Sequence, residues 1–144
     1  MGLFDFFKPR KQKSALEVLM ENPVFQQQKA FHDAMNDACA AGCDSDELPN
    51  GYGEFGLTPT NPIPTNTVMG SKTYLSRLLT ADGRKVENNR RCSMRTEVTE
   101  MPIDVYDLFL PDGTPVGTIY ISMWQKRTSA KAPRGFRLLF SDSD

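Results

Sequence analysis

The chain has 144 residues, of which 39% are hydrophobic and 24% are charged. This composition is typical of a globular domain that buries a core without disulfides, and it excludes wholesale disorder. The longest apolar runs are only a few residues, far short of the roughly 20 that a spanning helix needs. An integral membrane protein is therefore excluded as well.

Charge is distributed unevenly along the chain, although the net charge is only −1. Residues 1–60 carry five basic and nine acidic side chains, a net of −4, and residues 61–144 carry twelve and nine, a net of +3. The balance lacks the strong basic excess that is typical of nucleic-acid-binding proteins.

The first 13 residues place apolar side chains before basic ones. A secretory signal has the opposite order, and Phe6 stands where N-myristoylation requires Ser or Thr. Two interpretations remain: a flexible end or peptide that docks on a membrane surface or partner, and a terminus whose aromatic residues fold back on the core, which we favour. The residues concerned are Leu3, Phe4, Phe6, Phe7, Lys8, Arg10, Lys11 and Lys13. With no signal and three cysteines, an odd number, we expect a cytoplasmic protein with reduced thiols.

Two helices are predicted next, in a helical part over 14–42. Residues 14–17, Ser-Ala-Leu-Glu, form a capping box that begins a helix of about two turns. Asn22 and Pro23 are the preferred N-cap and first residue of a second helix, which the apolar spacing extends over 23–41. Gly42 is expected to end that helix in the left-handed conformation.

Residues 51–66 form a connecting segment rich in glycine and proline, whose composition predicts an ordered but irregular path. Phe55, Leu57 and Ile63 are expected to anchor this Gly/Pro segment in the core. In the alternative, which carries less weight, the segment also presents a binding face made of Tyr52, Glu54, Asn61 and Asn66. The Gly-x-Gly-x-x-Gly match at 51–56 does not predict a dinucleotide site, because a polar turn precedes it and a proline-rich stretch follows.

The sheet is predicted over 67–140. A strand is expected over 67–79, with a helical turn as the alternative because the apolar residues of 74–79 also fit a period near 3.6. Asp-Gly at 82–83 favours a hairpin that resumes at 85–86. Further strands are expected at 92–99, 103–110, 116–124 and 136–140. Helices followed by strands predict a single α+β domain over 14–144, with N-terminal helices packed on an antiparallel sheet of about four to six strands.

Enzymatic patterns are scarce. His32 is the only histidine, and a nucleophile pair or a zinc site would need Cys39, Cys43 or Cys92 beside it. The spacing matches neither a known finger nor a local catalytic pair. We therefore expect no catalytic residue, no metal site and no cofactor.

Residues 125–137, the basic segment, carry five positive charges and no acid. With nearby aromatic side chains this segment is a candidate for contacting phosphates and stacking bases, whereas the favoured alternative is a solvated connection that keeps a sheet edge soluble. The candidate binding residues are Trp124, Lys126, Arg127, Lys131 and Arg134. Arg84, Lys85, Arg90, Arg91 and Arg95 would extend the surface if the strands come together.

Four blocks of the chain carry a resemblance: GEFGLTPTNPIP at 53–64, YLSRL at 74–78, PIDVY at 102–106 and KRTSAKAP at 126–133. Together they resemble a group of small, uncharacterised, mostly bacterial proteins, over about 90 residues that exclude the helical part. The resemblance implies that the Gly/Pro segment and the basic segment belong to one unit, and it transfers no functional residue.

The function predicted from these observations is non-catalytic protein binding in the cytosol, of an inhibitor or immunity type. Three observations motivate this hypothesis: the sequence lacks a catalytic motif, it predicts an ordered loop, and it predicts a charged surface with aromatic residues at its edge. The alternative is a nucleic-acid-binding module that uses the basic segment.

Overall fold

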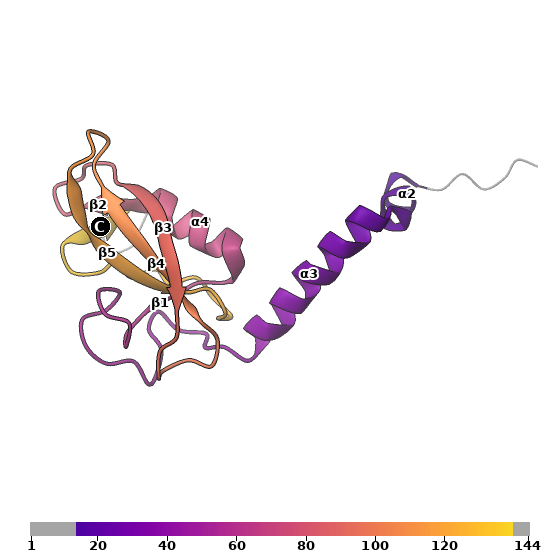
Figure 1. The fold of residues 1–144 in the computed structure, drawn as a ribbon, viewed down its shortest axis with the longest axis horizontal. Helices are drawn as coiled ribbons and strands as arrows, with labels where there is room; N and C mark the ends of the chain where they lie inside the picture. The colour runs from indigo at the N-terminus through magenta and orange to yellow at the C-terminus, as the bar shows by residue number, and fades with distance from the viewer. Residues whose placement is uncertain (1–13, 140–144) are drawn as a thin grey trace, which may run out of the picture. The chain divides into compact units, whose positions relative to one another are not determined.

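The computed structural model describes residues 14–139, so the predicted N-terminal peptide and the last five residues lie outside the described chain. The sequence predicts one domain from residue 14 onward, whereas contacts divide the chain between Ala34 and Met35 into two compact units (Figure 1). Each unit is described by itself below.

The N-terminal unit contains helix α2 (Ala15–Glu21) and most of helix α3 (Pro23–Ala40). The Ser14 hydroxyl accepts the Glu17 N–H at 3.1 Å, and the Asn22 side chain accepts the Val24 N–H at 2.9 Å. These side chains satisfy N–H groups that a helix leaves without partners in its first turn. Both predicted helix starts are confirmed.

The second unit, from Met35 onward, contains the last turns of α3 and a sheet-based body. Its main sheet has four strands in the order β1-β5-β4-β3, and β2 pairs with β6 in a separate two-stranded sheet. The strands are β1 (Ile63–Pro64), β2 (Leu78–Thr80), β3 (Glu87–Met94), β4 (Ile103–Phe109), β5 (Pro115–Ser122) and β6 (Phe136–Leu138). The α+β class is confirmed. The sheet is mixed rather than antiparallel, because β1 runs parallel to β5.

Helix α4 (Thr67–Arg77) occupies most of the region for which the strand over 67–79 was expected, so that prediction is wrong and the helical alternative is right. Its buried residues Thr67, Ser71, Tyr74 and Leu75 recur at helical spacing, so one face is covered. Strand structure begins only at β2. The predicted turn at 81–84 is present, since the Gly83 N–H donates to the Thr80 carbonyl at 2.9 Å.

Two further boundaries need correction. The strand expected at 92–99 begins earlier and ends at Met94, as β3. Gly42 is not left-handed; a Cβ there would lie 2.5 Å from the Trp124 carbonyl oxygen. Glycine at this position therefore allows two backbones to approach closely rather than reversing a helix.

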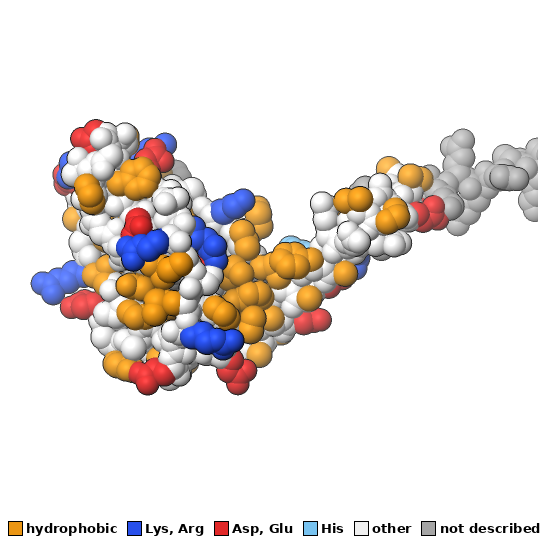
Figure 2. Space-filling view, viewed as in Figure 1, with side chains coloured by type: hydrophobic (Ala, Val, Ile, Leu, Met, Phe, Trp, Pro, Cys, Tyr) orange, Lys and Arg blue, Asp and Glu red, His pale blue; other side chains and the backbone are white. Residues whose placement is uncertain are grey.

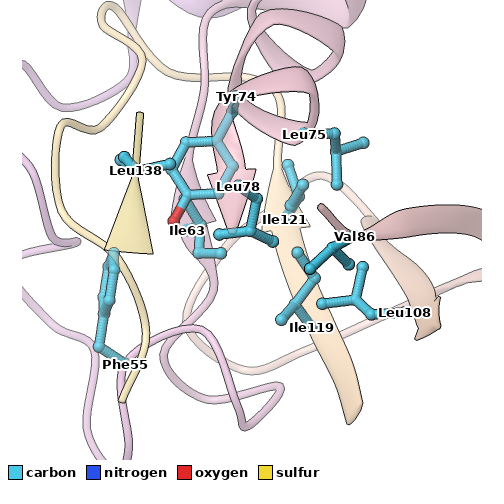
Figure 3. Close-up of a cluster of buried hydrophobic side chains, with 10 residues drawn as sticks. All are labelled: Phe55, Ile63, Tyr74, Leu75, Leu78, Val86, Leu108, Ile119, Ile121 and Leu138. Carbon is cyan, nitrogen blue, oxygen red and sulfur yellow. The ribbon is translucent and has the colours of Figure 1, made fainter. Parts of the chain in front are cut away.

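The core joins α4 to one face of the sheet (Figure 3). Tyr74 and Ile63 are fully buried between these elements, and the Tyr74 hydroxyl donates to the Lys131 carbonyl at 2.7 Å. Burial raises the pKa of Tyr74, so the hydroxyl stays a donor. The cluster comprises Phe55, Ile63, Tyr74, Leu75, Leu78, Val86, Leu108, Ile119, Ile121 and Leu138. Within residues 14–139, no helix is both long and apolar enough to cross a membrane.

Candidate binding cleft

The Gly/Pro segment packs along the β1 side of the sheet. Phe55 and Ile63 are buried, and the Gly56 carbonyl accepts the Tyr120 N–H of β5 at 2.9 Å. Gly56 has φ +75°, a backbone conformation that glycine adopts without the Cβ clash that other residues meet. The packing role expected for Phe55 and Ile63 is thus seen directly.

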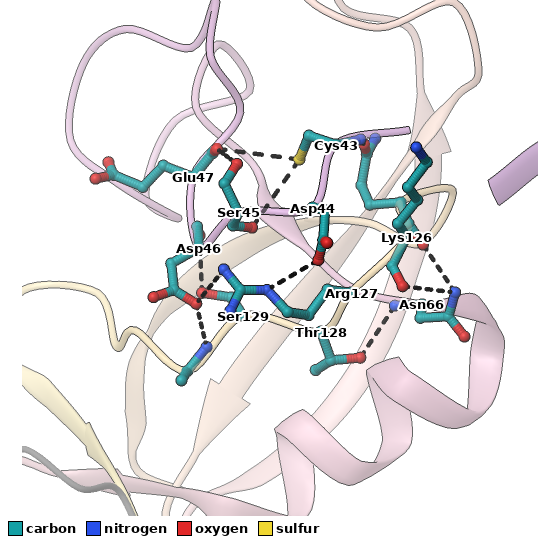
Figure 4. A network of polar contacts seen from close by, with 12 residues as sticks. Cys43, Asp44, Ser45, Asp46, Glu47, Asn66, Lys126, Arg127, Thr128 and Ser129 are labelled. Atoms are coloured by element: carbon teal, nitrogen blue, oxygen red, sulfur yellow. Dashed lines mark hydrogen bonds and ion pairs between the residues drawn. The ribbon is translucent and has the colours of Figure 1, made fainter. Parts of the chain in front are cut away.

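The basic segment lies against an acidic stretch, residues 44–54, that precedes and enters the Gly/Pro segment (Figure 4). Arg127 is 3.4 Å from Asp44 and 3.5 Å from Asp46. Lys131 is 2.8 Å from Glu47. These contacts join residues more than 80 positions apart, so two cations of the second half of the chain are paired with carboxylates of the first.

Hydrogen bonds reinforce the same contact. The Ser129 hydroxyl donates to the Asp46 carbonyl at 2.8 Å, and the Asp46 carboxylate accepts the Ala130 N–H at 2.9 Å. The Ser129 N–H donates to the Pro64 carbonyl of β1 at 2.8 Å. The basic segment therefore covers the outer edge of β1 as an ordered part of the fold.

Asn66 connects the start of α4 to the basic segment. Its side-chain amide donates to the Gln125 carbonyl at 2.9 Å, and its N–H donates to the Thr128 hydroxyl at 3.0 Å. The next residue, Thr67, has φ +65°, which is strained for a β-branched side chain. Its N–H donates to the Met123 carbonyl at 2.9 Å, a contact that holds it in this conformation.

A cleft of about 430 Å³ lies between the end of α3, the 48–50 turn, the loop after β3 and the end of β5. Leu48 and Val98 are buried in its wall, Trp124 is half-buried, and Met101 is 39% exposed at its rim. Its lining residues are Ala38, Ala41, Gly42, Cys43, Leu48, Pro49, Asn50, Val98, Thr99, Glu100, Met101, Ser122, Trp124 and Gln125.

The polar side chains of this cleft are largely engaged with the protein itself. Gln125 donates to the Ser122 hydroxyl at 2.9 Å and accepts the Cys43 N–H at 2.7 Å. Asn50 donates to the Val98 carbonyl at 2.9 Å. The walls are therefore fixed by internal hydrogen bonds, and what they offer a ligand is mainly apolar surface with one carboxylate, Glu100.

Four of the predicted binding residues line one of two separate hollows. Trp124 lines the cleft. Glu54, Lys131 and Arg134 line a separate depression of about 630 Å³, in which the Lys131 ammonium lies 5.1 Å from the centre of the Phe55 ring. Arg134 and Glu54 approach each other to 3.6 Å there.

The remaining predicted residues have structural partners or lie outside both hollows. Asn61 is only 5% exposed and donates to the Gly53 carbonyl. Tyr52 is exposed and its hydroxyl bonds Glu97. Asn66 and Arg127 belong to the network of Figure 4, and Lys126 is exposed beside them.

Leu48, Val98 and Met101 were not predicted as site residues. Each is an isolated apolar residue in a polar loop, a pattern that equally describes a loop anchored on the core. Only the fold brings them together with Trp124. The one usable signal was Trp124 itself, since aromatic residues are enriched in the centres of binding surfaces.

The residues considered for catalysis are divided between the two units and differ in exposure. His32 is exposed on α3, in the N-terminal unit. Cys39 is buried, Cys43 is half-buried and Cys92 is exposed. Burial raises the pKa of the Cys39 thiol, which makes it a poor nucleophile. Over the described part of the chain, no three His, Cys, Asp or Glu side chains gather as a metal ion would require.

Basic and acidic side chains are interspersed on the face shown in Figure 2, and no continuous basic surface is seen there. Arg84, Arg90 and Arg91, which would extend such a surface, are paired with Asp82, Asp104 and Asp107. Comparison of the chain with protein-family models, curated proteins and solved structures finds no match.

Proposed function

We propose that this chain is a non-catalytic protein-binding module whose cleft takes an extended partner segment. The supporting observation is the cleft itself, a hollow of about 430 Å³ with Trp124 in its wall and Met101 at its rim. Concave surfaces lined by aromatic and apolar side chains, with few polar groups, are typical of recognition sites. Fixed walls also reduce the entropy lost on binding.

The charge of the cleft selects the kind of partner. Glu100 is its one charged lining residue, and no lining residue is basic. A partner segment with a large apolar side chain next to Lys or Arg would fill the apolar wall and pair with Glu100 at the rim. Opposite charges at a rim contribute mostly to the rate and specificity of association.

An inhibitor- or immunity-type protein of the cytosol is the form of this function that we favour. Such a protein would bind an enzyme and block it, and it needs no catalytic group of its own. The free thiols of Cys39, Cys43 and Cys92 agree with a reducing compartment.

Nucleic-acid binding by the basic segment receives less support. Affinity for phosphates depends on cations that are free to displace counterions. Arg127, Lys131 and Arg134 each approach a carboxylate of the acidic stretch to 3.6 Å or less. Salt-dependent binding of single-stranded RNA at low ionic strength would revive this alternative.

Selection from a random-peptide display library tests the proposed function. The full chain serves as bait, and we expect enriched peptides that share a large apolar residue beside Lys or Arg. Met101→Lys should weaken these peptides by roughly tenfold or more, because it removes an apolar contact at the rim and places a like charge beside the Lys or Arg of the peptide. Asp112→Lys, in the distant β4–β5 turn, is the matched control and should leave binding unchanged. The proposal fails if no peptide family emerges, or if the peptides bind the Met101→Lys variant as tightly as the wild type.

A further inference from the structure

The helices of the N-terminal unit carry a concentration of exposed apolar side chains (Figure 2). Of the nine large apolar residues that are exposed in residues 14–139, four belong to this unit. They are Leu16 and Val18 in α2 and Val24 and Phe31 in α3, between 58% and 67% exposed. None of the side chains described in this unit is buried. The described part of the unit therefore has no core of its own.

Helices of this kind need an apolar surface to cover them. Isolated helices shorter than about 12–15 residues are marginal in water, and α2 has seven residues. In α3, Val24 and Phe31 are seven residues apart, which is close to two complete turns, so they lie on one face of the helix. These two exposed side chains form an apolar face that no described residue buries.

The segment that directly precedes α2 has the composition to cover this face. Residues 1–13 lie outside the described chain, and their sequence places an apolar block at 3–7 before a basic block at 8–13. The Ser14 hydroxyl caps the first turn of α2, and Pro9 is unsuited to a helix interior. The apolar block is therefore not a continuation of α2, and the chain can turn back along the helices.

The length of this segment is sufficient for the return. An extended chain spans about 3.3 Å per residue, so Phe7 can reach about 23 Å from Ser14 and Leu3 about 36 Å. An α-helix rises about 1.5 Å per residue, which places Val24 about 15 Å and Phe31 about 26 Å from Ser14 along the helices. Both residues of the apolar face are thus within reach.

Charge distinguishes this segment from other candidate occupants of the face. Residues 1–13 carry four basic and one acidic side chain, a net of +3, whereas residues 14–34 carry three acidic and one basic, a net of −2. Helices that lie on a lipid surface carry Lys and Arg on their polar face, where this unit has Glu17, Glu21 and Asp33. Two copies of the acidic helices would repel each other. The basic segment of the same chain is the complementary occupant.

We propose that the apolar block 3–7 folds back on the face of α3 that carries Val24 and Phe31, with the basic block 8–13 beside the acidic side chains of α2. This docking gives the unit the apolar core that its described residues lack. The N-terminal peptide is then an intramolecular strap over the two helices. It uses no residue that lines the binding cleft, so it is independent of the proposed function.

Limited tryptic digestion of the full chain tests the docking. Trypsin cleaves after Lys and Arg, and cleavage after Arg10 and Lys11 follows the population of the undocked form when docking is fast. Phe31→Asp places a charge on the apolar face and should speed this cleavage by roughly fivefold or more. Ala30→Asp adds the same charge about 100° around the helix and is the matched control, which should leave the rate unchanged. Equal rates for wild type and Phe31→Asp overturn the proposal.

A nitroxide label near the N-terminus is a second test, and it leaves the helices unaltered. Gly2→Cys carries the label in a chain whose exposed Cys92 and half-buried Cys43 are replaced by Ser. Docking predicts broadening of the α3 amide signals over 24–31, and Phe4→Asp should abolish it. Broadening that is confined to the first turn of α2 overturns the proposal.

Two further measurements identify a different occupant. Labelled chain is mixed with unlabelled, isotope-enriched chain, and broadening of α3 in the enriched copy would show that the contact joins two copies. Sedimentation with vesicles of phosphatidylcholine and phosphatidylserine, with Phe4→Asp as the control, detects docking on a lipid surface. Either a contact between copies or vesicle binding that Phe4→Asp abolishes overturns the proposal. Broadening within one chain, without vesicle binding, supports it.

Discussion

Both edges of the main sheet carry ion pairs between basic and acidic side chains, but the β1 edge is covered and the β3 edge is exposed. At the β1 edge, the basic segment covers the strand, which is itself part of the Gly/Pro segment, and Ile63 is fully buried. At the β3 edge, six consecutive residues are exposed. Ion pairs occur at both, but those at the β1 edge join Arg127 and Lys131 to residues far away in sequence, whereas Arg90 and Arg91 clamp neighbouring strands.

This difference teaches that ion pairs alone do not show which surface is structural and which is available. Exposed pairs contribute little stability by themselves. At the β1 edge the ion pairs accompany buried apolar side chains and backbone hydrogen bonds, so they belong to a packed structural surface. At the β3 edge they only position a strand whose outer side stays open.

The largest effect expected from this comparison concerns Ile63 and Asn88. Ile63→Ala removes a fully buried side chain of β1 and should lower the free energy of unfolding by about 2–5 kcal/mol. Asn88→Ala, in exposed β3, should change it by no more than about 0.5 kcal/mol. Chemical denaturation of both variants measures the contrast. Similar losses at the two positions would show that β3 supports the core after all.

Gly56 tests how tightly the Gly/Pro segment covers its edge. A Cβ at Gly56 would lie 2.8 Å from Pro133 and 2.9 Å from Ile63, and Gly56→Ala adds this overpacking, about 1–3 kcal/mol, to the strain of a positive φ. Gly113→Ala is the matched control, because Gly113 also has positive φ but nothing lies within 4 Å. It should cost about 1–2 kcal/mol. Thermal unfolding of the pair would refute a tight cover if the two losses were equal.

Asp46 and Asp44 separate hydrogen bonding from surface charge. The Asp46 carboxylate accepts the Ala130 N–H, so Asp46→Ala should cost about 1–2 kcal/mol. Among the described residues, the Asp44 carboxylate contacts Arg127 as an ion pair, at 3.4 Å, and Asp44→Ala should cost about 0.5 kcal/mol or less. Urea denaturation at low and high salt measures both. An equally large, salt-sensitive loss at Asp44 would mean that charge rather than hydrogen bonding holds the basic segment.

The smallest expected effect is the pH response of the β3 clamp. The hydrogen bond from Arg91 lowers the pKa of Asp107 below its ordinary value. The stabilisation is therefore complete above the ordinary aspartate pKa and is lost as pH falls through the lowered one. Carboxyl NMR titration should show this lower midpoint in the wild type and an ordinary one in Arg91→Gln. If the Asp107 midpoint is the same in both proteins, the hydrogen bond from Arg91 does not stabilise the Asp107 carboxylate and does not hold β3 in place.

Local patterns were sufficient for much of the fold. The start of α3 at Pro23 follows from a side-chain cap and a fixed φ, both properties of adjacent residues. The β4 and β5 hairpin follows from β-branched and aromatic runs around Asp-Gly, and its strands lie close to the predicted bounds. The resemblance-based link between the Gly/Pro and basic segments agrees with their contacts in the structure, although the resemblance itself stays a prediction.

The candidate sites were harder to predict. The apolar residues of 74–79 fit both the strand and the helix period. Burial of Tyr74 against the sheet decides for helix α4, and a window of sequence does not contain that contact. The cleft unites residues from 38 to 125, and no local signal links Met101 to Trp124. One alternative from the sequence predicts an open cationic surface on the basic segment. The sequence does not show otherwise, because the carboxylate partners of this segment lie more than 80 residues earlier.

By itself the sequence determined the α+β class, the helix caps, the turns and the absence of a recognisable catalytic motif, because each depends on neighbouring residues. Only the tertiary structure decided which charges are neutralised, where a cleft forms and which sheet edge stays open. Those properties depend on contacts between distant segments, whose free energy comes from burial and long-range pairing rather than from local conformational preference.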